Sequence, residues 1–423
     1  MLAEFDDLIC TDAVSCNIVN KIAGALAVSG AVVWAVVKLT WAKVLKFNNF
    51  LRSRQRALSA VARAVTLDGP KEGAGIWALQ PITQPENYKN DLQGARILAV
   101  ANLKGGVGKT TIAANIAAHL ANDRAWQKRV LLVDLDYQGS LSSMSFPDDS
   151  SWLPPAQTDS VATRSLSGDL EPNLFLAAAT AVNQQPRLKV ITAHYDLAQA
   201  DNRLLIEWLL NVAKTEKRDW KRWLADFFIG KLYQPHEMRY NLAKLLHSQA
   251  VREAFDLVII DCPPRLTAGT IQAFCGSSHV LIPTILDKPS GESIVSFCEQ
   301  VEALKSAGLC PHIRYLGIVA TRYNPRVNSG PATVQFVNDQ LTARKFKCGF
   351  LPQSTFIPQT EALVREASQG IAYFTLHGNS QAAKAKNAIA SLAQHVALQI
   401  GVPPVQSFDL TDQQQLSLPV AAE

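Results

Sequence analysis

The chain has 423 residues, a length that suits one large domain with additions better than a single domain of average size. Apolar residues make up 48% and charged residues 18%, so the chain can bury a core, and global disorder is excluded. The net charge of +5 is only a weak indication of nucleic-acid binding. The 7 cysteines contain no C-x-x-C pair, which argues against a disulfide framework or a zinc site and favours a reducing compartment.

The N-terminal region, residues 1–67, is predicted to be helical, hydrophobic and basic. Its uncharged run Ile22–Val37 would span about 24 Å as a helix, somewhat less than the roughly 30 Å of a bilayer core. Three alternatives remain for residues 22–37: a membrane span, a helix lying on the lipid surface, and a packing helix of a soluble fold. A span would anchor the rest of the chain to the inner face of the cell membrane, because the Lys- and Arg-rich side follows it.

Residues 68–95 are rich in glycine, proline and polar residues without a clear period, which predicts a linker. From Arg96 onward, short apolar runs alternate with helical stretches, a pattern typical of a mostly parallel, twisted sheet with helices on both faces. This α/β domain is expected over 96–400. The predicted strands are Ile97–Ala101, Arg129–Leu135, Leu188–Ala193, Phe255–Asp261, His279–Leu286, Ile313–Thr321 and Phe346–Leu351.

One stretch interrupts this alternation. Residues 202–250 are predicted to form a helical insertion, and its basic, aromatic segment Lys217–Lys231 favours an amphipathic packing helix over a nucleic-acid contact. The polar tail, 401–423, is expected to be frayed.

A glycine-rich loop, Lys104–Thr111 (KGGVGKTT), follows a predicted strand and opens a predicted helix, as a phosphate-binding loop does. Its glycines let backbone N–H groups form an anion nest, to which the helix N-terminus adds partial positive charge. The Lys109 ammonium can reach the β and γ phosphates, and the Thr110 hydroxyl is placed for Mg²⁺. The loop therefore predicts a nucleotide site formed by Gly105, Gly106, Val107, Gly108, Lys109, Thr110 and Thr111.

This loop resembles the deviant Walker A motif of the ParA/MinD family of P-loop ATPases, because Lys104 occupies the position of the usual first glycine. The segment LLVDLDYQGS, residues 131–140, is similar to that family's next motif, and FDLVIIDCPP, residues 255–264, resembles its Walker B strand and switch. The resemblance covers roughly 96–400 without the helical insertion. It implies a P-loop NTPase fold, ATP and Mg²⁺ as ligands, and slow, partner-stimulated hydrolysis of ATP.

Residue roles follow from the resemblance alone. Lys104 would reach the nucleotide of a second subunit in an ATP-bound homodimer, and Asp136 would position the attacking water. Asp134 and Asp261 would lie near Mg²⁺, with Asp261 as the Walker B carboxylate. Pro352, after the last predicted strand, would border the adenine.

The resemblance leaves two roles open. A membrane-tethered regulator that acts on a protein partner is favoured by residues 22–37 and by the insertion. A soluble partition ATPase that binds nonspecific DNA is the alternative, and it predicts salt-sensitive binding to a basic surface. In both cases the ATPase domain is expected in the cytoplasm.

Overall fold

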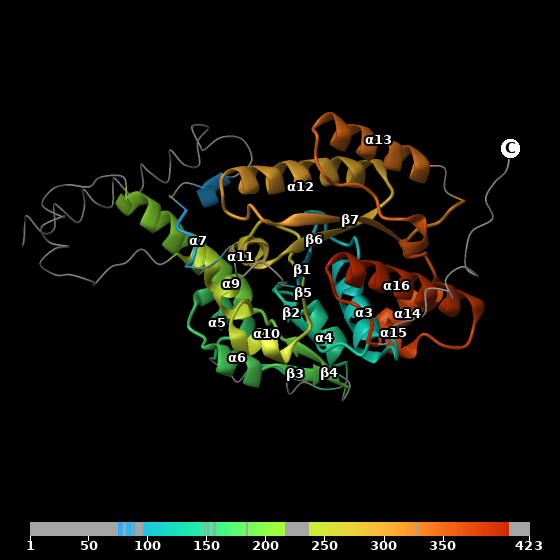
Figure 1. Ribbon diagram of the computed structural model, residues 1–423, viewed down its shortest axis with the longest axis horizontal. Coiled ribbons are helices and arrows are strands. Elements are labelled where there is room, and N and C mark those ends of the chain that lie inside the picture. Colours follow the sequence, from blue (N-terminus) through green and yellow to red (C-terminus); the bar gives the residue numbers. More distant parts are fainter. Residues whose placement is uncertain are drawn as a thin grey trace, which may run out of the picture. The chain divides into compact units, whose positions relative to one another are not determined.

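A seven-stranded sheet forms the centre of the computed structural model (Figure 1), with the strand order β3-β4-β2-β5-β1-β6-β7. All pairings are parallel except that of β3 with β4. The structure describes residues 75–78, 82–86, 88, 96–147, 149, 152–154, 158–182, 185–215, 237–326 and 329–405. The strands are β1 (Ile97–Val100), β2 (Val130–Asp134), β3 (Thr180–Val182), β4 (Gln185–Ile191), β5 (Leu257–Asp261), β6 (His279–Ile285) and β7 (Arg314–Thr321).

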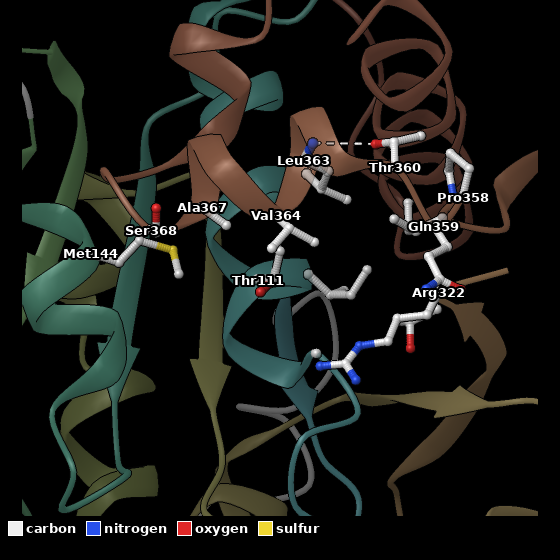
Figure 2. A pocket seen from close by; sticks show the side chains of 14 residues that line it. Thr111, Met144, Arg322, Pro358, Gln359, Thr360, Leu363, Val364, Ala367 and Ser368 are labelled. Carbon is white, nitrogen blue, oxygen red and sulfur yellow. Dashed lines mark hydrogen bonds between the residues drawn. The ribbon is translucent and has the colours of Figure 1, made fainter. Parts of the chain in front are cut away.

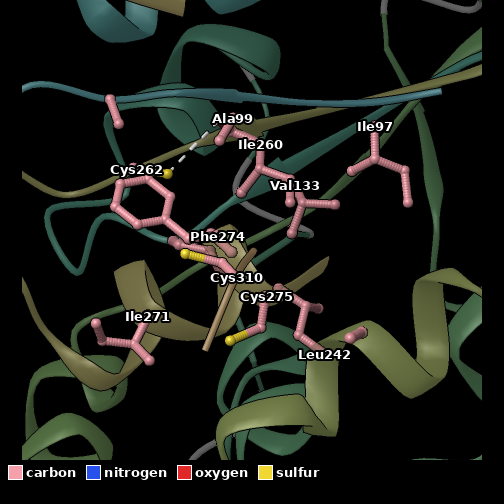
Figure 3. Close-up of a cluster of buried hydrophobic side chains, with 14 of the residues drawn as sticks. Ile97, Ala99, Val133, Leu242, Ile260, Cys262, Ile271, Phe274, Cys275 and Cys310 are labelled. Atoms are coloured by element: carbon pink, nitrogen blue, oxygen red, sulfur yellow. Dashed lines mark hydrogen bonds between the residues drawn. The ribbon is translucent and has the colours of Figure 1, made fainter. Parts of the chain in front are cut away.

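Successive side chains of the central strands enter two different cores, one on each face of the sheet. In β1, Ile97 and Ala99 belong to the first core, which Figure 3 shows with Val133 and Phe274 packed nearby. Leu98 and the other alternate residues of β1 belong to the second core. Because a strand directs alternate side chains to opposite faces, apolar runs without polar interruption are required here.

Helices cover both faces (Figure 1). The first core is closed by α5 (Val161–Ser167), α6 (Pro172–Ala177), α7 (Asp196–Thr215), α9 (Asn241–Leu246), α10 (Gln249–Ala254), α11 (Ala268–Gly276), α12 (Lys288–Ser306) and α13 (Ser329–Ala343). The second core is closed by α3 (Lys109–Asn122), α4 (Ser140–Ser145), α14 (Glu361–Ala367), α15 (Ala372–Thr375) and α16 (Ser380–Gln399). Three 3₁₀ turns complete the described elements: η1 (Gly75–Ala78), η2 (Met238–Tyr240) and η3 (Gln353–Thr355).

The predicted α/β class is confirmed, and six of the predicted strands match β1, β2 and β4–β7 with shifted ends. The strand predicted at Phe346–Leu351 is wrong: this segment touches β7 through a bridge between Phe350 and Ile318. Pro352 follows directly and has no N–H group to continue a ladder. The remaining strand is the antiparallel edge β3, which the sequence analysis did not predict.

The segment predicted as a linker contributes buried side chains to the first core. Trp77 and Tyr88 are only 5% and 4% exposed. The sequence of this segment has no regular spacing of apolar residues that would have predicted their burial. The helical stretch predicted from residue 202 begins earlier, at Asp196, and its segment Lys217–Lys231 lies outside the described residues.

The segments for which a helical N-terminal region, residues 1–67 with the 22–37 run, and a frayed tail are predicted also lie outside the described residues, except for 401–405 of the tail. Within the part of the chain that the structure describes, no helix combines the length and apolarity that crossing a membrane requires.

Candidate functional site

The glycine-rich loop lies at the carboxyl end of β1, between its neighbours β5 and β6. Gly106 and Gly108 have φ angles of 72° and 85°, which residues with a side chain rarely adopt. The backbone then enters α3 at Lys109, so that the free N–H groups of the first turn face the loop. Gly105 and Val107 lie in the loop itself, and Thr110 and Thr111 lie in the first turn of α3. Backbone N–H groups at such a helix start are the groups that bind anions in proteins.

The loop is held in shape from both sides. The Lys109 ammonium donates to the carbonyl of Lys104 at 3.2 Å, although its side chain is almost fully buried. The hydroxyl of Thr321, at the end of β7, lies 2.9 Å from the Val107 carbonyl and 3.0 Å from that of Thr284. Burial lowers the pKa of Lys109, and the carboxylates of Asp261 and Asp136 oppose this effect.

Asp261 ends β5 with a side chain that is fully buried. Among the described residues, neither of its carboxylate oxygens has a hydrogen-bond partner of good geometry, although the Thr110 hydroxyl is near enough to favour the charged form. Burial and the neighbouring Asp134 raise the pKa of Asp261 well above its usual value, and Thr110 and Lys109 act in the opposite direction. A buried carboxylate without a partner beside a threonine hydroxyl is the arrangement that a hard cation such as Mg²⁺ fits.

Asp134 lies opposite Asp261 in the register of β2 and β5, but its oxygens already have partners. One accepts from the Asp136 amide at 3.0 Å, and the other accepts from the amide and hydroxyl of Ser142 at 2.9 and 2.7 Å. Burial raises the pKa of Asp134 to about 7 against these hydrogen bonds. The Asp134 carboxylate therefore holds the loop after β2 through its hydrogen bonds, whereas the Asp261 oxygens are available to a ligand.

Asp136 is 7% exposed and lies in that loop, where its carboxylate accepts from the amide of Gln138 at 3.1 Å. Tyr137, which follows it, packs edge-on against the exposed ring of Tyr195, with ring centroids 6.4 Å apart. The carboxylates of Asp136 and Asp261 both raise the pKa of Lys109, so the structure places these three residues near one another.

The Lys104 side chain turns toward α12 of the same chain. Its ammonium lies 3.1 Å from Oδ1 of Asp287 and 2.6 Å from the hydroxyl of Ser290. Asp287 also caps α12 by accepting from the Ser290 amide at 2.7 Å. The sequence analysis missed both partners, because they lie more than 180 residues from Lys104 and belong to no motif.

A pocket of about 570 Å³ adjoins the loop and is open to solvent. Figure 2 shows Arg322 pointing toward the first turn of α3, where Thr111 is labelled. Arg322 has a φ of 49°, an unfavourable value for a residue with a side chain. Pro358 lines this pocket, whereas Pro352 begins the turn η3 and is not among the lining residues that the structure describes.

A phosphate loop at the carboxyl edge of a parallel sheet, with a buried carboxylate and an adjoining pocket, defines a P-loop nucleotide-binding protein. The family model of the CobQ/CobB/MinD/ParA nucleotide binding domain matches residues 98–372. The chain therefore belongs to this family, and the resemblance noted in its motifs is confirmed.

Two relatives with assigned names are each 28% identical to this chain. The chain is 28% identical over 275 residues to the sporulation initiation inhibitor protein Soj of Bacillus subtilis, covering 65% of this chain and 88% of Soj. It is 28% identical over 231 residues to the chromosome partitioning protein ParA of Caulobacter vibrioides, covering 55% of this chain and 71% of ParA. The structure of a Cyanothece McdA–ATP complex shares the fold, with a TM-score of 0.52, 18% identity, and coverage of 74% of this chain and 99% of McdA.

Proposed function

We propose that the chain is an ATP-binding and ATP-hydrolysing switch that binds ATP together with Mg²⁺ and forms a homodimer in the ATP state. The observation that carries the proposal is the buried carboxylate of Asp261, beside Lys109 and Thr110 of the phosphate loop. Among the described residues, its two oxygens have no hydrogen-bond partner of good geometry. Membership of a nucleotide-binding family supports it.

The residues of the site would divide the chemistry among them. The loop N–H groups and Lys109 bind the phosphates, and Thr110 and Asp261 hold Mg²⁺, while Asp134 keeps the loop after β2 in place. When bound, Mg²⁺ would neutralise phosphate charge. Asp136 would orient the attacking water, and Arg322 and Pro358 would border the ribose and base.

Lys104 supplies the link between nucleotide and dimer. In a single chain its ammonium is paired with Asp287, on the side of the loop that faces α12. In the dimer we expect it to leave this partner and to meet the phosphates bound by the second subunit. Because these contacts exist only in the ATP dimer, ATP would favour that state, and hydrolysis would release it.

The proposed switch acts on a protein partner or a cargo from the cytoplasm. Residues 22–37 support a version tethered to the inner face of the cell membrane. The similarity to Soj and ParA supports the alternative, a soluble partition ATPase that binds nonspecific DNA. Alkaline extraction of membranes from cells that express the full chain separates the two, since a spanning anchor resists extraction and a DNA-binding form is released.

Phosphate release by the full chain tests the enzymatic part. We expect slow hydrolysis of ATP that requires Mg²⁺ and that disappears in Lys109→Gln, which replaces the ammonium with an uncharged amide on a side chain one atom shorter. Wild-type chain that binds no ATP in the presence of Mg²⁺ would exclude the proposed function.

A further inference from the structure

The segment before the sheet is fastened to the nucleotide-binding domain by two aromatic side chains. We call residues 75–88 the strap, of which the structure describes 75–78, 82–86 and 88. Trp77 and Tyr88 are both buried in the first core, one near each end of the strap. In chain order the strap lies between the basic N-terminal region and β1.

The Trp77 end is held by α7 and by η2. The indole N–H of Trp208 donates to the carbonyl of Ile76 at 2.8 Å, and a guanidinium N–H of Arg239 donates to that of Trp77 at 2.8 Å. The Arg239 guanidinium lies 4.5 Å from the ring of Trp208, and its charge is paired with Glu237. Because the Arg239 side chain is fully buried, moving the strap away would leave one of its N–H groups without the Trp77 carbonyl, and an unpaired buried donor is costly.

The Tyr88 end is held by α11. Its hydroxyl donates to the carbonyl of Cys275 in the last turn of that helix. Its ring packs edge-on against Tyr240, with centroids 5.0 Å apart, and the Tyr240 hydroxyl donates to the carbonyl of Leu309 at 2.8 Å. Between the two anchors, the amide of Gln84 donates to the carbonyl of Gly308 at 3.1 Å.

Both anchoring helices also reach the loop that follows the open carboxylate. After Asp261 the chain runs through Cys262–Leu266 to Thr267, whose side chain caps α11. The carboxylate of Asp201, on α7, accepts from the amide of Gly269 in the first turn of α11 at 3.2 Å. The same helix carries Trp208 two turns further on. Thus α11 leads directly from the site to Tyr88, and α7 leads from the start of α11 to the Trp77 end.

We propose that the strap couples the occupancy of the nucleotide site to the N-terminal region, through α11 and α7. A cation bound by Asp261 would offset the buried negative charge at the end of β5, and we expect the loop after it to adjust. Helices transmit such a shift as rigid elements. The contacts to the strap are buried or partly buried hydrogen bonds and ring contacts, so we expect the strap to move with the helices. Linkage makes the effect reciprocal: what binds the N-terminal region changes the affinity for nucleotide.

The identity of the ligand in this inference rests on the proposed function, whereas the contacts of the strap are independent of it. Hydrogen exchange measured by mass spectrometry on the full chain tests the coupling, in peptides that cover 75–88. The amide of Tyr88, which donates to the carbonyl of Pro85 at 3.1 Å, is one reporter. We expect saturating Mg²⁺ and a non-hydrolysable ATP analogue to change exchange in the strap by about fivefold or more.

Tyr88→Phe removes one hydroxyl and keeps the ring, and we expect it to reduce the nucleotide-dependent change. Tyr315→Phe is the matched control, because the Tyr315 hydroxyl also donates to a cysteine carbonyl, that of Cys298, away from the strap. It should leave the nucleotide-dependent change as in the wild type. Equal exchange in the strap with and without bound nucleotide would overturn the coupling.

Asp261→Asn separates this inference from the proposed function. It removes the charge at the end of β5 without any ligand, so we expect altered exchange in the strap of the nucleotide-free variant. Asp256→Asn, which removes the charge of a half-buried carboxylate just before β5, is the control. If the chain binds no nucleotide, the proposed function fails, and strap exchange that is also unchanged in Asp261→Asn rejects the coupling.

Discussion

The ammonium of Lys104 lies 3.1 Å from the carboxylate of Asp287 and 2.6 Å from the Ser290 hydroxyl, across the space between the phosphate loop and the start of α12. The side chains of this ion pair are 31% and 42% exposed. Such a pair is weak and easily replaced, since exposed ion pairs contribute little. Lys104 is therefore held in its own chain by weak contacts, which the phosphates of the second subunit would replace in the proposed dimer.

Asp287→Asn should make dimerisation easier. Asparagine keeps the cap of α12 but not the charge that attracts Lys104. We expect the protein concentration needed for half-dimerisation, with Mg²⁺ and an ATP analogue, to fall by about two- to fivefold, the range for an exposed pair. Sedimentation velocity over a concentration series measures it. Glu299 also lies on α12 and pairs with Arg344, so Glu299→Gln removes a carboxylate from the same helix away from Lys104. This control should have no effect.

Asp261→Asn should abolish Mg²⁺-dependent function without unfolding the domain. The substitution removes a buried charge that repels Asp134, so the thermal midpoint without nucleotide should stay or rise. Hydrolysis should fall by about a hundredfold or more, because loss of even indirect metal contacts reaches that range. Phosphate release and thermal unfolding are measured in parallel. Hydrolysis near the wild-type rate would show that Asp261 does not serve the reaction.

Arg322→Asn should weaken nucleotide binding and stabilise the fold. Asparagine tolerates the φ of 49° better than arginine, so the free energy of unfolding should rise by up to about 1 kcal/mol. Loss of a charged hydrogen-bond donor from the pocket should reduce nucleotide affinity by about tenfold. Isothermal titration measures the affinity. Arg326→Asn, in the exposed turn beyond, serves as control, and equal affinities for both variants would remove Arg322 from the site.

Ser142→Ala should destabilise the loop after β2. The Ser142 hydroxyl donates to Asp134 and accepts from the amide of Ala193 at 2.9 Å, and the side chain is fully buried. Alanine leaves that amide without a partner, so the free energy of unfolding in urea should fall by about 1–3 kcal/mol. Ser165→Ala, which removes a buried hydroxyl that donates to the Val161 carbonyl within α5, should lower it less. Similar losses would mean that the bridge to Ala193 contributes nothing.

The features that could be predicted from the sequence are those that depend on burial or backbone conformation at each residue. The continuous apolar runs of β1, β2 and β5 follow from burial on both faces, and the glycines at 106 and 108 follow from their positive φ angles. The edge strand β3 escaped prediction because three residues, one of them exposed, carry no period. The segment Phe346–Leu351 has the composition of a strand but meets the sheet only around Phe350.

Contacts between distant parts of the chain could not be predicted from composition. Trp77 and Tyr88 belong to a polar, proline-containing segment, and only their partners in α7, η2 and α11 explain their burial. The partners of Lys104 and the lining of the pocket by Pro358 likewise depend on how β6 and β7 end. The motif residues could be named as site candidates from the sequence. The side chains that surround them depend on tertiary packing and could not.

The mass of the full chain in solution, measured by light scattering after gel filtration, tests the proposed switch most directly. With Mg²⁺ and a non-hydrolysable ATP analogue, the wild type should elute at twice the mass that it has with ADP, and Lys104→Gln should keep the ADP mass in both conditions. A wild type that binds the analogue but has the same mass in both states would contradict the switch.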